Sequence, residues 1–528
     1  MKTKIEEVLK KTVTLKFNLK EKINFKVEIP KNKKFGDYST NIAMVLAGKL
    51  HKKPSDIANE LIDELEKSFL FKQVEIAGKG FINFHLNEAV WVNLLNEIND
   101  TENYFSLNIG NNKKILIEFV SANPTGPLHI GHGRGAVLGD VLANLLSKVN
   151  FNVTKEYYIN DAGNQMNILG NSIFLRAMEL LGEEINFPDD HYQGDYIKKI
   201  AESIIDEFGK TVIKKDLKFF TEYGVNAILP EIKEDLEAFG IKFDNWFSEK
   251  SLFNSGKVDL LLKNLKEKGT IYEKEGAWWI KVEDDEDRVI IKKDGSYTYL
   301  TSDIAYHKDK FDRGYNELID IWGADHHGYI SRIKSAVKSV GENPDNLKIL
   351  LVQMVNLLRD KKRLPLSTRK GKFVTLREVV EEVGKDAARF IFMTRKYDAQ
   401  LDFDINLAKQ HSNDNPVYYV QYAHARICSI LKYSADEFPE KFSHLTSGDD
   451  IKIIRKLSDF KNVLLSAATN LEPHLITYYL MELAGEFHSY YNKNKILGNN
   501  ERIFLISVIK KVIAEGLNIL GVNAPEKM

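Results

Sequence analysis

The sequence predicts an α/β protein with a parallel-sheet domain in the middle of the chain, a smaller α+β domain before it and an all-helical domain after it. Two observations support this prediction. Between residues 113 and about 410, short apolar runs are each followed by a polar or glycine-containing turn and then by apolar residues at helical spacing, as in a parallel sheet with connecting helices. From about residue 411 onward only helical spacing recurs and the loops are short, as in a helix bundle.

The composition is that of an ordinary globular protein. The chain has 528 residues, of which 43% are hydrophobic and 28% are charged, and its net charge is −1. No run of about 18 apolar residues occurs, and the basic N-terminus lacks the apolar segment of a signal peptide. A single cysteine, Cys428, excludes an internal disulfide and a multi-cysteine zinc site. We therefore expect a cytoplasmic protein that does not associate with membranes.

Residues 1–108 are predicted to form the N-terminal α+β domain. Its expected elements are helices at 6–13 and 54–69 and strands at 74–77 and 81–86. Residues 96–112 are rich in Asn and Glu, which predicts a linker. Residues 1–34 contain eleven lysines and four glutamates, an excess of seven positive charges. This excess favours a phosphate-contacting patch and a solvated lysine-rich face equally.

Residues 109–410 are predicted to form the parallel-sheet domain, with an insertion at about 185–295. The strands are expected at 115–120, 153–159, 318–322 and 349–352, with ligands at their carboxyl ends. Within the insertion, Glu283–Asp287 is interpreted as a solvated acidic turn. Metal binding is a distant second interpretation, because adjacent carboxylates repel one another. Asp294-Gly295 predicts a hairpin turn.

Residues 411–528 are predicted to form the all-α domain. Apolar residues at helical spacing begin near Val417 and continue through long amphipathic segments. Helices are expected at 451–471, 473–491 and 501–520.

The most informative stretch is 113–140, which has the order strand, glycine-rich turn, helix. Such a turn directs free backbone N–H groups and the positive end of a helix toward one point, which suits a phosphate. His129 and His132, at i and i+3, should face the same side. Neutral rings would each donate one hydrogen bond to the charge that develops in phosphoryl or nucleotidyl transfer. The alternatives are one core histidine with one helix cap, or a zinc pair, although no third ligand is close in sequence.

Several motifs resemble those of a known family. His129-Ile-Gly-His132 resembles a signature of class I aminoacyl-tRNA synthetases, and the longer string Ser121-Ala-Asn-Pro-Thr-Gly-Pro-Leu-His-Ile-Gly-His132 resembles its form in the bacterial-type arginyl-tRNA synthetase family. Further similar stretches follow in order, and the resemblance extends over the whole chain: Tyr157–Gln165, Tyr299–Asp303, Gly323–Gly328, Val352–Val355 and Ala524–Met528.

The resemblance implies a Rossmann-like catalytic domain that ligates L-arginine to tRNA(Arg) through an arginyl-adenylate. It implies ATP, with Mg²⁺ on the nucleotide, and no structural zinc. The expected partners are tRNA(Arg), arginine and ATP, and a monomer is expected. The expected nucleotide-contacting residues are Gly131, His129, His132, Gly323, Asp325, Met354, Val355 and Ser367.

A guanidinium substrate requires carboxylates, whose oxygens match its fixed fork of donors. By resemblance, Glu249 and Asp303 hold the guanidinium, with Tyr299 packed beside it. Ser121, Asn123 and Glu118 would hold the backbone end of arginine. His326, with Asp325, follows a predicted strand end, where the amino group or the ribose would lie.

A second class I signature, Lys-Met-Ser-Lys-Ser, corresponds here to Leu364–Gly371. Pro365 and Thr368 stand where the family has lysines, while Ser367 remains. We expect Lys370 to act as the catalytic loop cation, because Gly371 follows it and can serve as a hinge. Arg369 and Lys372 are the alternatives.

The resemblance also implies that the N-terminal domain contacts tRNA and that the C-terminal domain binds the anticodon. The candidate tRNA-binding residues are Phe81, Asn83, Tyr418 and Tyr422, although core packing of Phe81 is favoured. Two other functions stay open on the sequence alone. An uncharged pocket in place of Glu249 and Asp303 would favour a class I synthetase for another amino acid. The altered second signature favours a tRNA-binding paralogue without catalysis, which the two intact histidines oppose.

Overall fold

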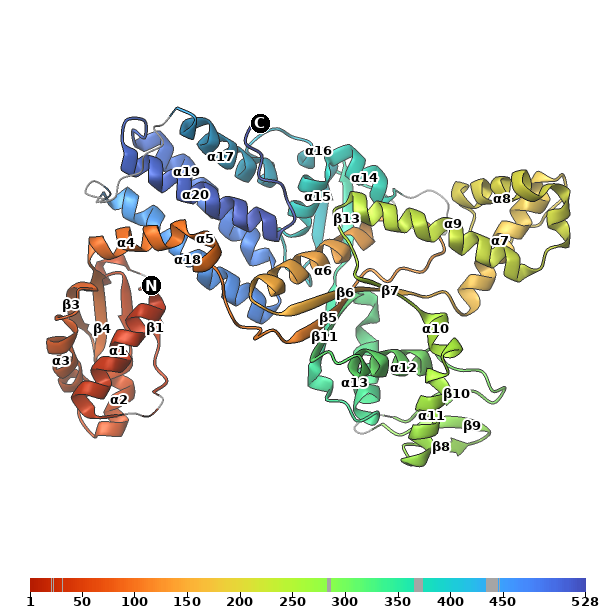
Figure 1. The fold of residues 1–528 in the computed structure, drawn as a ribbon, viewed down its shortest axis with the longest axis horizontal. Helices are drawn as coiled ribbons and strands as arrows, with labels where there is room; N and C mark the ends of the chain where they lie inside the picture. The colour runs from red at the N-terminus through yellow and green to blue at the C-terminus, as the bar shows by residue number, and fades with distance from the viewer. Residues whose placement is uncertain are drawn as a thin grey trace. The chain divides into compact units, whose positions relative to one another are not determined.

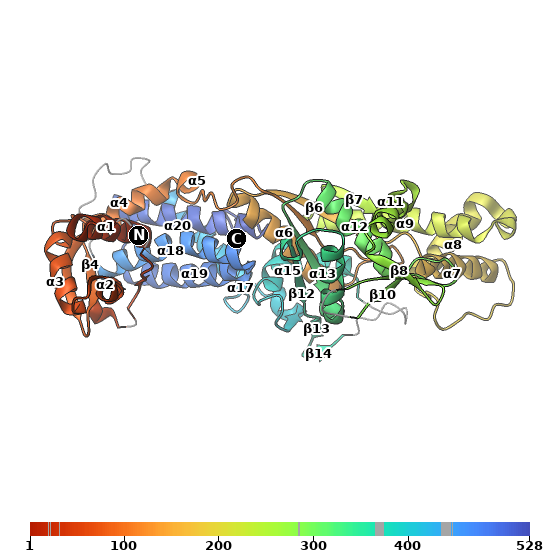
Figure 2. The same cartoon turned by 90° about the horizontal axis from the view of Figure 1, so that it is seen from below.

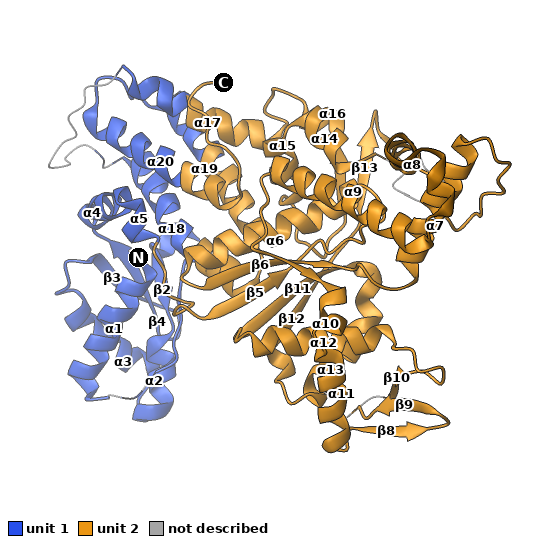
Figure 3. Cartoon of the chain, turned by 45° about the vertical axis from the view of Figure 1, so that its right-hand side comes forward, with its two compact units in different colours: residues 1–105, 426–462, 485–512 blue, residues 106–425, 463–484, 513–528 orange. Residues whose placement is uncertain are grey.

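The computed structural model describes residues 1–19, 21, 23–30, 32–282, 286–364, 374–433, 445 and 447–528. The chain forms two compact units (Figure 3). Unit 1 comprises residues 1–105, 426–462 and 485–512, and unit 2 comprises residues 106–425, 463–484 and 513–528. Among the described residues, no helix is long and apolar enough to cross a membrane.

Unit 1 contains a four-stranded antiparallel sheet of order β1-β2-β4-β3. The strands are β1 (Val27–Glu28), β2 (Tyr38–Thr40), β3 (Phe71–Ala77) and β4 (Phe81–Leu86). The helices that accompany them are α1 (Lys2–Phe17), η1 (Lys33–Phe35), α2 (Ile42–Leu50), α3 (Pro54–Leu65), α4 (Glu88–Asn99) and α5 (Thr101–Tyr104). The predicted helices and strands of this region are confirmed, with α3 ending four residues early.

The predicted linker at 96–112 is wrong in its first half, because α4 continues to Asn99 and α5 follows directly. Asp100 ends one helix and begins the next, since its carboxylate accepts a hydrogen bond from the Asn103 backbone N–H. Phe105 is fully buried and packs edge-on against Phe460, with ring centroids 5.0 Å apart. The polar composition of this segment therefore did not predict the short capped helix α5, which ends at a residue packed in an apolar core.

Unit 2 is built on a five-stranded parallel sheet of order β12-β11-β5-β6-β7. Its strands are β5 (Lys114–Glu118), β6 (Asn152–Ile159), β7 (Asn245–Ser248), β11 (Glu317–Gly323) and β12 (Leu347–Val352). Four of these strands confirm the prediction. The edge strand β7 was missed because it lies within the predicted insertion, and its four residues are all only half-buried.

Helices cover both faces of this sheet: α6 (Ile130–Lys148) lies on one face, and α12 (Tyr299–Asp312) and α13 (Ile330–Ser339) lie on the other (Figures 1 and 3). Between β6 and β7 in the chain, α7 (Asn164–Leu180), α8 (Asp195–Phe208) and α9 (Leu217–Ala238) pack side by side (Figure 2). The remaining elements up to residue 300 are η2 (Gly209–Lys214), α10 (Glu249–Asn254), α11 (Lys257–Glu267), β8 (Ile271–Lys274), β9 (Ala277–Ile280) and β10 (Arg288–Ile291).

The other predicted features of the insertion lie near β10. Gly295 has φ of 80°, as expected for the hairpin turn at Asp294-Gly295. Most of the predicted acidic turn Glu283–Asp287 lies outside the described residues. At its end, Asp287 accepts a hydrogen bond from the Tyr272 hydroxyl at 2.7 Å.

The C-terminal half of the chain is mostly helical. Its elements are η3 (Ala324–Tyr329), η4 (Pro344–Asn346), β13 (Val355–Arg359), β14 (Lys362–Arg363), α14 (Leu376–Val383), α15 (Lys385–Phe392), β15 (Leu401–Asp404), α16 (Ile405–Ala408), α17 (Pro416–Leu431), α18 (Gly448–Asn470), α19 (His474–Lys493) and α20 (Asn500–Ile519). The last four helices confirm the predicted all-α region from residue 411 onward.

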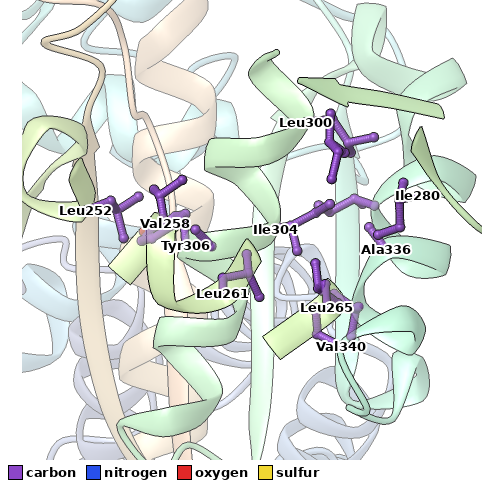
Figure 4. Packing of buried hydrophobic residues seen from close by; sticks show 14 of the residues in the cluster. Leu252, Val258, Leu261, Leu265, Ile280, Leu300, Ile304, Tyr306, Ala336 and Val340 are labelled. Atoms are coloured by element: carbon purple, nitrogen blue, oxygen red, sulfur yellow. The ribbon is translucent and has the colours of Figure 1, made fainter. Parts of the chain in front are cut away.

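An apolar core fixes α12 against the sheet. Ile304 and Tyr306 of α12 pack with Leu261 and Leu265 of α11 and with Ala336 of α13 (Figure 4). All five side chains are at most 7% exposed. Because Asp303 is the fifth residue of α12, this packing determines where that carboxylate lies relative to the strand ends.

Candidate active site

Two histidine rings stack at the N-terminus of α6. The centroids of His129 and His132 lie 3.7 Å apart, and the ring planes are inclined by 17°. The Nδ1 atom of His129 accepts a hydrogen bond from the Gly131 backbone N–H at 3.1 Å, and the Nδ1 atom of His132 accepts one from the His129 backbone N–H at 3.2 Å. Since each Nδ1 atom acts as an acceptor, the proton of each neutral ring must be on Nε2. His129 is therefore a helix cap, and capping leaves its Nε2–H as a donor.

Both rings are held in the neutral form. Burial lowers the pKa of His129, and burial together with the neighbouring ring lowers the pKa of His132 to about 3. Each neutral ring can donate one hydrogen bond, from its Nε2–H group, to an anion at this end of the helix.

The histidines open into a cavity of about 540 Å³ at the carboxyl ends of three parallel strands. Its walls come from the segments after β5, from the end of β11 and from the segment after β12. Nine of the predicted site residues line it: Ser121, Asn123, His129, Gly131, His132, Gly323, Asp325, His326 and Met354. Asn160, Trp322 and Gln353 also line the cavity and were not predicted. Val355 is not part of the lining; it starts β13 and is 1% exposed.

A buried arginine that the sequence did not reveal holds the β12 side of the cavity. Arg134 is 1% exposed, and its guanidinium donates hydrogen bonds to the backbone oxygens of Gln353 at 3.0 Å, Ala399 at 2.7 Å and Lys396 at 2.8 Å. The helix that carries the histidines is thereby tied to the backbone that follows β12. The sequence signal for this buried arginine is its position between two glycines in the first part of α6.

Two carboxylates, of which Glu249 is buried and Asp303 is partly buried, lie outside the lining of the cavity. Glu249, the first residue of α10, is 6% exposed, and Asn160 can donate its side-chain amide to it at 2.7 Å. Asp303 of α12 accepts a hydrogen bond from the Tyr329 hydroxyl. Within the described ranges of the chain, no lysine, arginine or histidine forms an ion pair with either acid. Burial raises the pKa of both carboxyl groups, and the charge of Asp303 raises that of Glu249 further.

The third predicted acid has a different environment. Glu118 at the end of β5 accepts a hydrogen bond from the Ser121 hydroxyl at 2.8 Å and forms an ion pair with Lys310 at 2.5 Å. Lys310 is fully buried and also pairs with Asp320 at 2.8 Å. Its own cation therefore neutralises Glu118, and Ser121 is the group that reaches the cavity.

The remaining predicted residues are placed as follows. Tyr299 begins α12 and is 67% exposed, so its ring is not part of the buried packing around the acids. Ser367 and Lys370 lie in the segment 365–373, outside the described residues. The favoured core position of Phe81 is wrong, because its ring is 43% exposed, whereas Asn83 is buried. Tyr418 and Tyr422 stack with centroids 6.0 Å apart at 8°.

Comparisons with known proteins match the whole chain. The family model "tRNA synthetases class I (R), catalytic domain" matches residues 94–405, "Arginyl tRNA synthetase N terminal domain" matches residues 1–86, and "DALR anticodon binding domain" matches residues 420–528. An arginine–tRNA ligase of Geobacter sp. (strain M21) is 50% identical, with 95% of this chain and 94% of the relative covered. One of Aquifex aeolicus is 45% identical, with 100% of both chains covered. The arginyl-tRNA synthetase structure of Thermus thermophilus has the same fold, with a TM-score of 0.77 at 21% identity over 100% of both chains.

Proposed function

We propose a role for each side chain of the site, from the premise that the chain belongs to the arginyl-tRNA synthetase family. The chain catalyses the ATP-dependent ligation of L-arginine to tRNA(Arg): arginyl-adenylate and pyrophosphate form first, and the arginyl group then passes to the tRNA with release of AMP. The observation that carries the residue assignment is a pair of carboxylates, one buried and one partly buried, that have no ion-pair partner among the described residues and lie near a cavity that contains two neutral histidines.

The nucleotide is assigned to the histidine side of the cavity. The Nε2–H groups of His129 and His132 donate to phosphate oxygens as pyrophosphate leaves, when negative charge on those oxygens grows. Donors fixed by backbone hydrogen bonds need no reorganisation at that moment. The other assigned nucleotide contacts are Gly131, Gly323, Asp325, Met354 and Ser367, and Lys370 is the assigned loop cation; Val355 is left out because it is buried outside the cavity lining.

Magnesium is assigned to the nucleotide rather than to a protein cage. No group of three or more His, Cys, Asp or Glu side chains in the described part of the chain is arranged to hold a metal ion. Mg²⁺ is usually held by one or two carboxylates together with substrate phosphates. Asp325 is the carboxylate of the cavity and would supply the protein's share. The ion would neutralise phosphate charge when it is bound.

Arginine is assigned to the acid side. Glu249 and Asp303 accept hydrogen bonds from the guanidinium, whose charge replaces the missing cation. Ser121, Asn123 and His326 face the cavity and hold the α-amino and carboxylate end. Glu118 acts through Ser121, because its own oxygens are occupied by Lys310 and by the Ser121 hydroxyl. Tyr299, exposed at the start of α12, is assigned to cover the guanidinium.

Transfer RNA is assigned to both ends of the chain. Residues 1–108 contact the tRNA body, residues 109–410 catalyse the reaction, and residues 411–528 bind the anticodon. Phe81 is exposed enough to stack on a base. The parallel rings of Tyr418 and Tyr422 offer a second stacking surface. Asn83 is also assigned to the tRNA site, although its side chain is buried. The protein is assigned as a cytoplasmic monomer.

Steady-state kinetics with Asp303→Asn and Glu249→Gln test the arginine assignment. Removal of one partner of a desolvated guanidinium–carboxylate pair costs about 3–5 kcal/mol, so the KM for arginine should rise by at least about 10²-fold with little change for ATP. Glu317→Gln is the matched control, because this acid pairs with Lys348 at 3.0 Å away from the cavity. Normal arginine KM values in both variants would place the pocket elsewhere.

The nucleotide assignment has a separate test. His129→Ala and His132→Ala should each slow adenylate formation by about 10²-fold, or about 3 kcal/mol, with the fold retained. For the loop, single-turnover rates of Lys370→Ala, Arg369→Ala and Lys372→Ala should show the largest loss of adenylate formation in Lys370→Ala. Transfer from preformed adenylate should be largely unaffected. A larger loss in either neighbour reassigns the role of loop cation.

A further inference from the structure

Tyr329 connects the two halves of the site. It is the last residue of η3, whose Asp325 and His326 line the nucleotide cavity. Its hydroxyl donates a hydrogen bond to Oδ2 of Asp303. Its ring lies 6.0 Å from that of Trp322, which also lines the cavity. No sequence motif drew attention to this tyrosine, and the roles assigned above do not use it.

The hydrogen bond acts on both the charge and the orientation of Asp303. A donor favours the ionised form of a carboxyl group, whereas burial favours the neutral form, and the two act in opposition here. With Oδ2 fixed by Tyr329, the carboxylate plane is set and Oδ1 can accept from a ligand. Besides Tyr329, the charged or titratable groups that face Asp303 come from three other elements and from its own helix: Tyr158, Glu249, His307, Lys310 and Asp320.

We propose that Tyr329 is a positioning residue that sets the charge selectivity of the arginine pocket, because its hydroxyl orients Asp303 and favours its ionised form over its neutral form. The proposal rests on the assignment of Asp303 to the guanidinium. An ionised carboxylate can only accept hydrogen bonds, so it suits a guanidinium and repels the carbonyl oxygen of a urea group. A protonated carboxyl group could donate to that oxygen. The hydroxyl of Tyr329 therefore favours arginine over citrulline, its neutral urea isostere.

The test is Tyr329→Phe, which removes the hydroxyl and keeps the ring beside Trp322. The kcat/KM for arginine should fall about tenfold, the usual size for a hydrogen bond to a charged group, through KM rather than kcat. The apparent pKa of the acid limb of kcat/KM for arginine should rise, because Asp303 loses the donor that favours its charge. The inhibition constant of citrulline should stay constant or fall, so selectivity for arginine should decrease about tenfold.

The matched control is Tyr272→Phe, which deletes a similar hydroxyl–carboxylate hydrogen bond, to Asp287 at 2.7 Å, outside the site. It should leave KM, pH profile and selectivity unchanged. An Asp303→Asn variant distinguishes a failure of the pocket assignment from a failure of the role of Tyr329. If Asp303→Asn binds arginine normally, the pocket assignment fails. If Asp303→Asn loses arginine while Tyr329→Phe keeps the wild-type pH profile and citrulline selectivity, only the role of Tyr329 is overturned.

Discussion

Two groups of carboxylates in unit 2, buried except for the partly buried Asp303, differ in what neutralises them. Glu118 and Asp320 share the buried ammonium group of Lys310, with pair distances of 2.5 and 2.8 Å. Glu249 and Asp303 accept hydrogen bonds from neutral groups, and no ion pair joins either acid to a cation in the described parts of the chain. An unpaired buried charge is expensive. The chain thus pairs Glu118 and Asp320 with its own lysine, whereas Glu249 and Asp303 have no such cation among the described residues, as the proposed binding of a cationic substrate there requires.

The pKa shifts separate Asp320 from the other three acids. Burial alone would raise the pKa of Asp320, but Lys310 and His307 lower it to about 2. Glu118 shares Lys310 and is less well compensated, so burial still raises its pKa. For Glu249 and Asp303, burial prevails and both pKa values are raised. A cation that entered beside them would reverse those two shifts.

His307 supports the internally paired set. Its Nδ1 atom lies 2.8 Å from the backbone oxygen of Asp303, and its Nε2 atom lies 2.8 Å from Oδ2 of Asp320. His307 therefore contacts both Asp320 and the backbone of Asp303, while Lys310 is the cation that Glu118 and Asp320 share.

The largest expected effect comes from breaking the paired group. Lys310→Met removes the shared cation and leaves two buried carboxylates, which should destabilise the fold by about 3–5 kcal/mol. The measurement is urea-induced unfolding of the full chain. The control is Lys308→Met in the same helix, whose ion pair with Asp312 is partly exposed and should contribute less than about 1 kcal/mol. Equal losses in the two variants would show that Lys310 does not neutralise the group.

A second paired acid should respond less strongly. Glu156 is fully buried and accepts two hydrogen bonds from the guanidinium of Arg313, at 2.5 and 2.8 Å, but the Arg313 side chain is 28% exposed. Water can partly replace the lost cation, and the hydroxyl of Tyr306 still donates to Glu156 at 2.7 Å. Arg313→Met should therefore cost about 1.5–3 kcal/mol in the same unfolding assay. A loss of unfolding free energy as large as that of Lys310→Met would mean that partial exposure of Arg313 does not reduce the cost of leaving Glu156 without its cation.

The affinity for arginine at the unpaired acids, Glu249 and Asp303, should depend on pH. If arginine binds the ionised carboxylates as proposed, protonation of Glu249 or Asp303 competes with it. Arginine affinity, measured by calorimetry, should then fall by up to about tenfold per pH unit once the pH drops below the raised pKa values of these groups. Asp320 has a depressed pKa, so the stability it contributes is lost only at lower pH, between its unfolded value and about 2. Loss of binding and loss of folding should thus separate. Coincident loss of both would remove the distinction between the two groups.

The sequence was sufficient for the elements that carry regular patterns. β5, β6, β11 and β12 have apolar runs followed by polar turns, and the glycine-rich start of α6 is visible without a structure. β7 was not visible because a half-buried edge strand has no continuous apolar run.

The compensating cations were harder to predict than the acids. A lysine in a helix usually lies on the surface, so the sequence gives no reason to expect that Lys310 is buried. The signal was its spacing, since Asp303, His307 and Lys310 recur at i, i+4 and i+7 and therefore share one face of α12. Arg134 was equally hidden, because its partners are backbone carbonyls more than 200 positions away.

The central claim is that Asp303 is left without a cation for the sake of arginine, and thermal unfolding of Asp303→Asn tests it most directly. A raised folded-state pKa means that ionised Asp303 costs stability as the pH rises through that value, so at neutral pH the amide should unfold at a higher temperature than the wild type when arginine is absent. Added arginine should raise the unfolding temperature of the wild type and not that of the variant. A variant that is less stable without arginine, and that arginine still stabilises as in the wild type, would contradict the account.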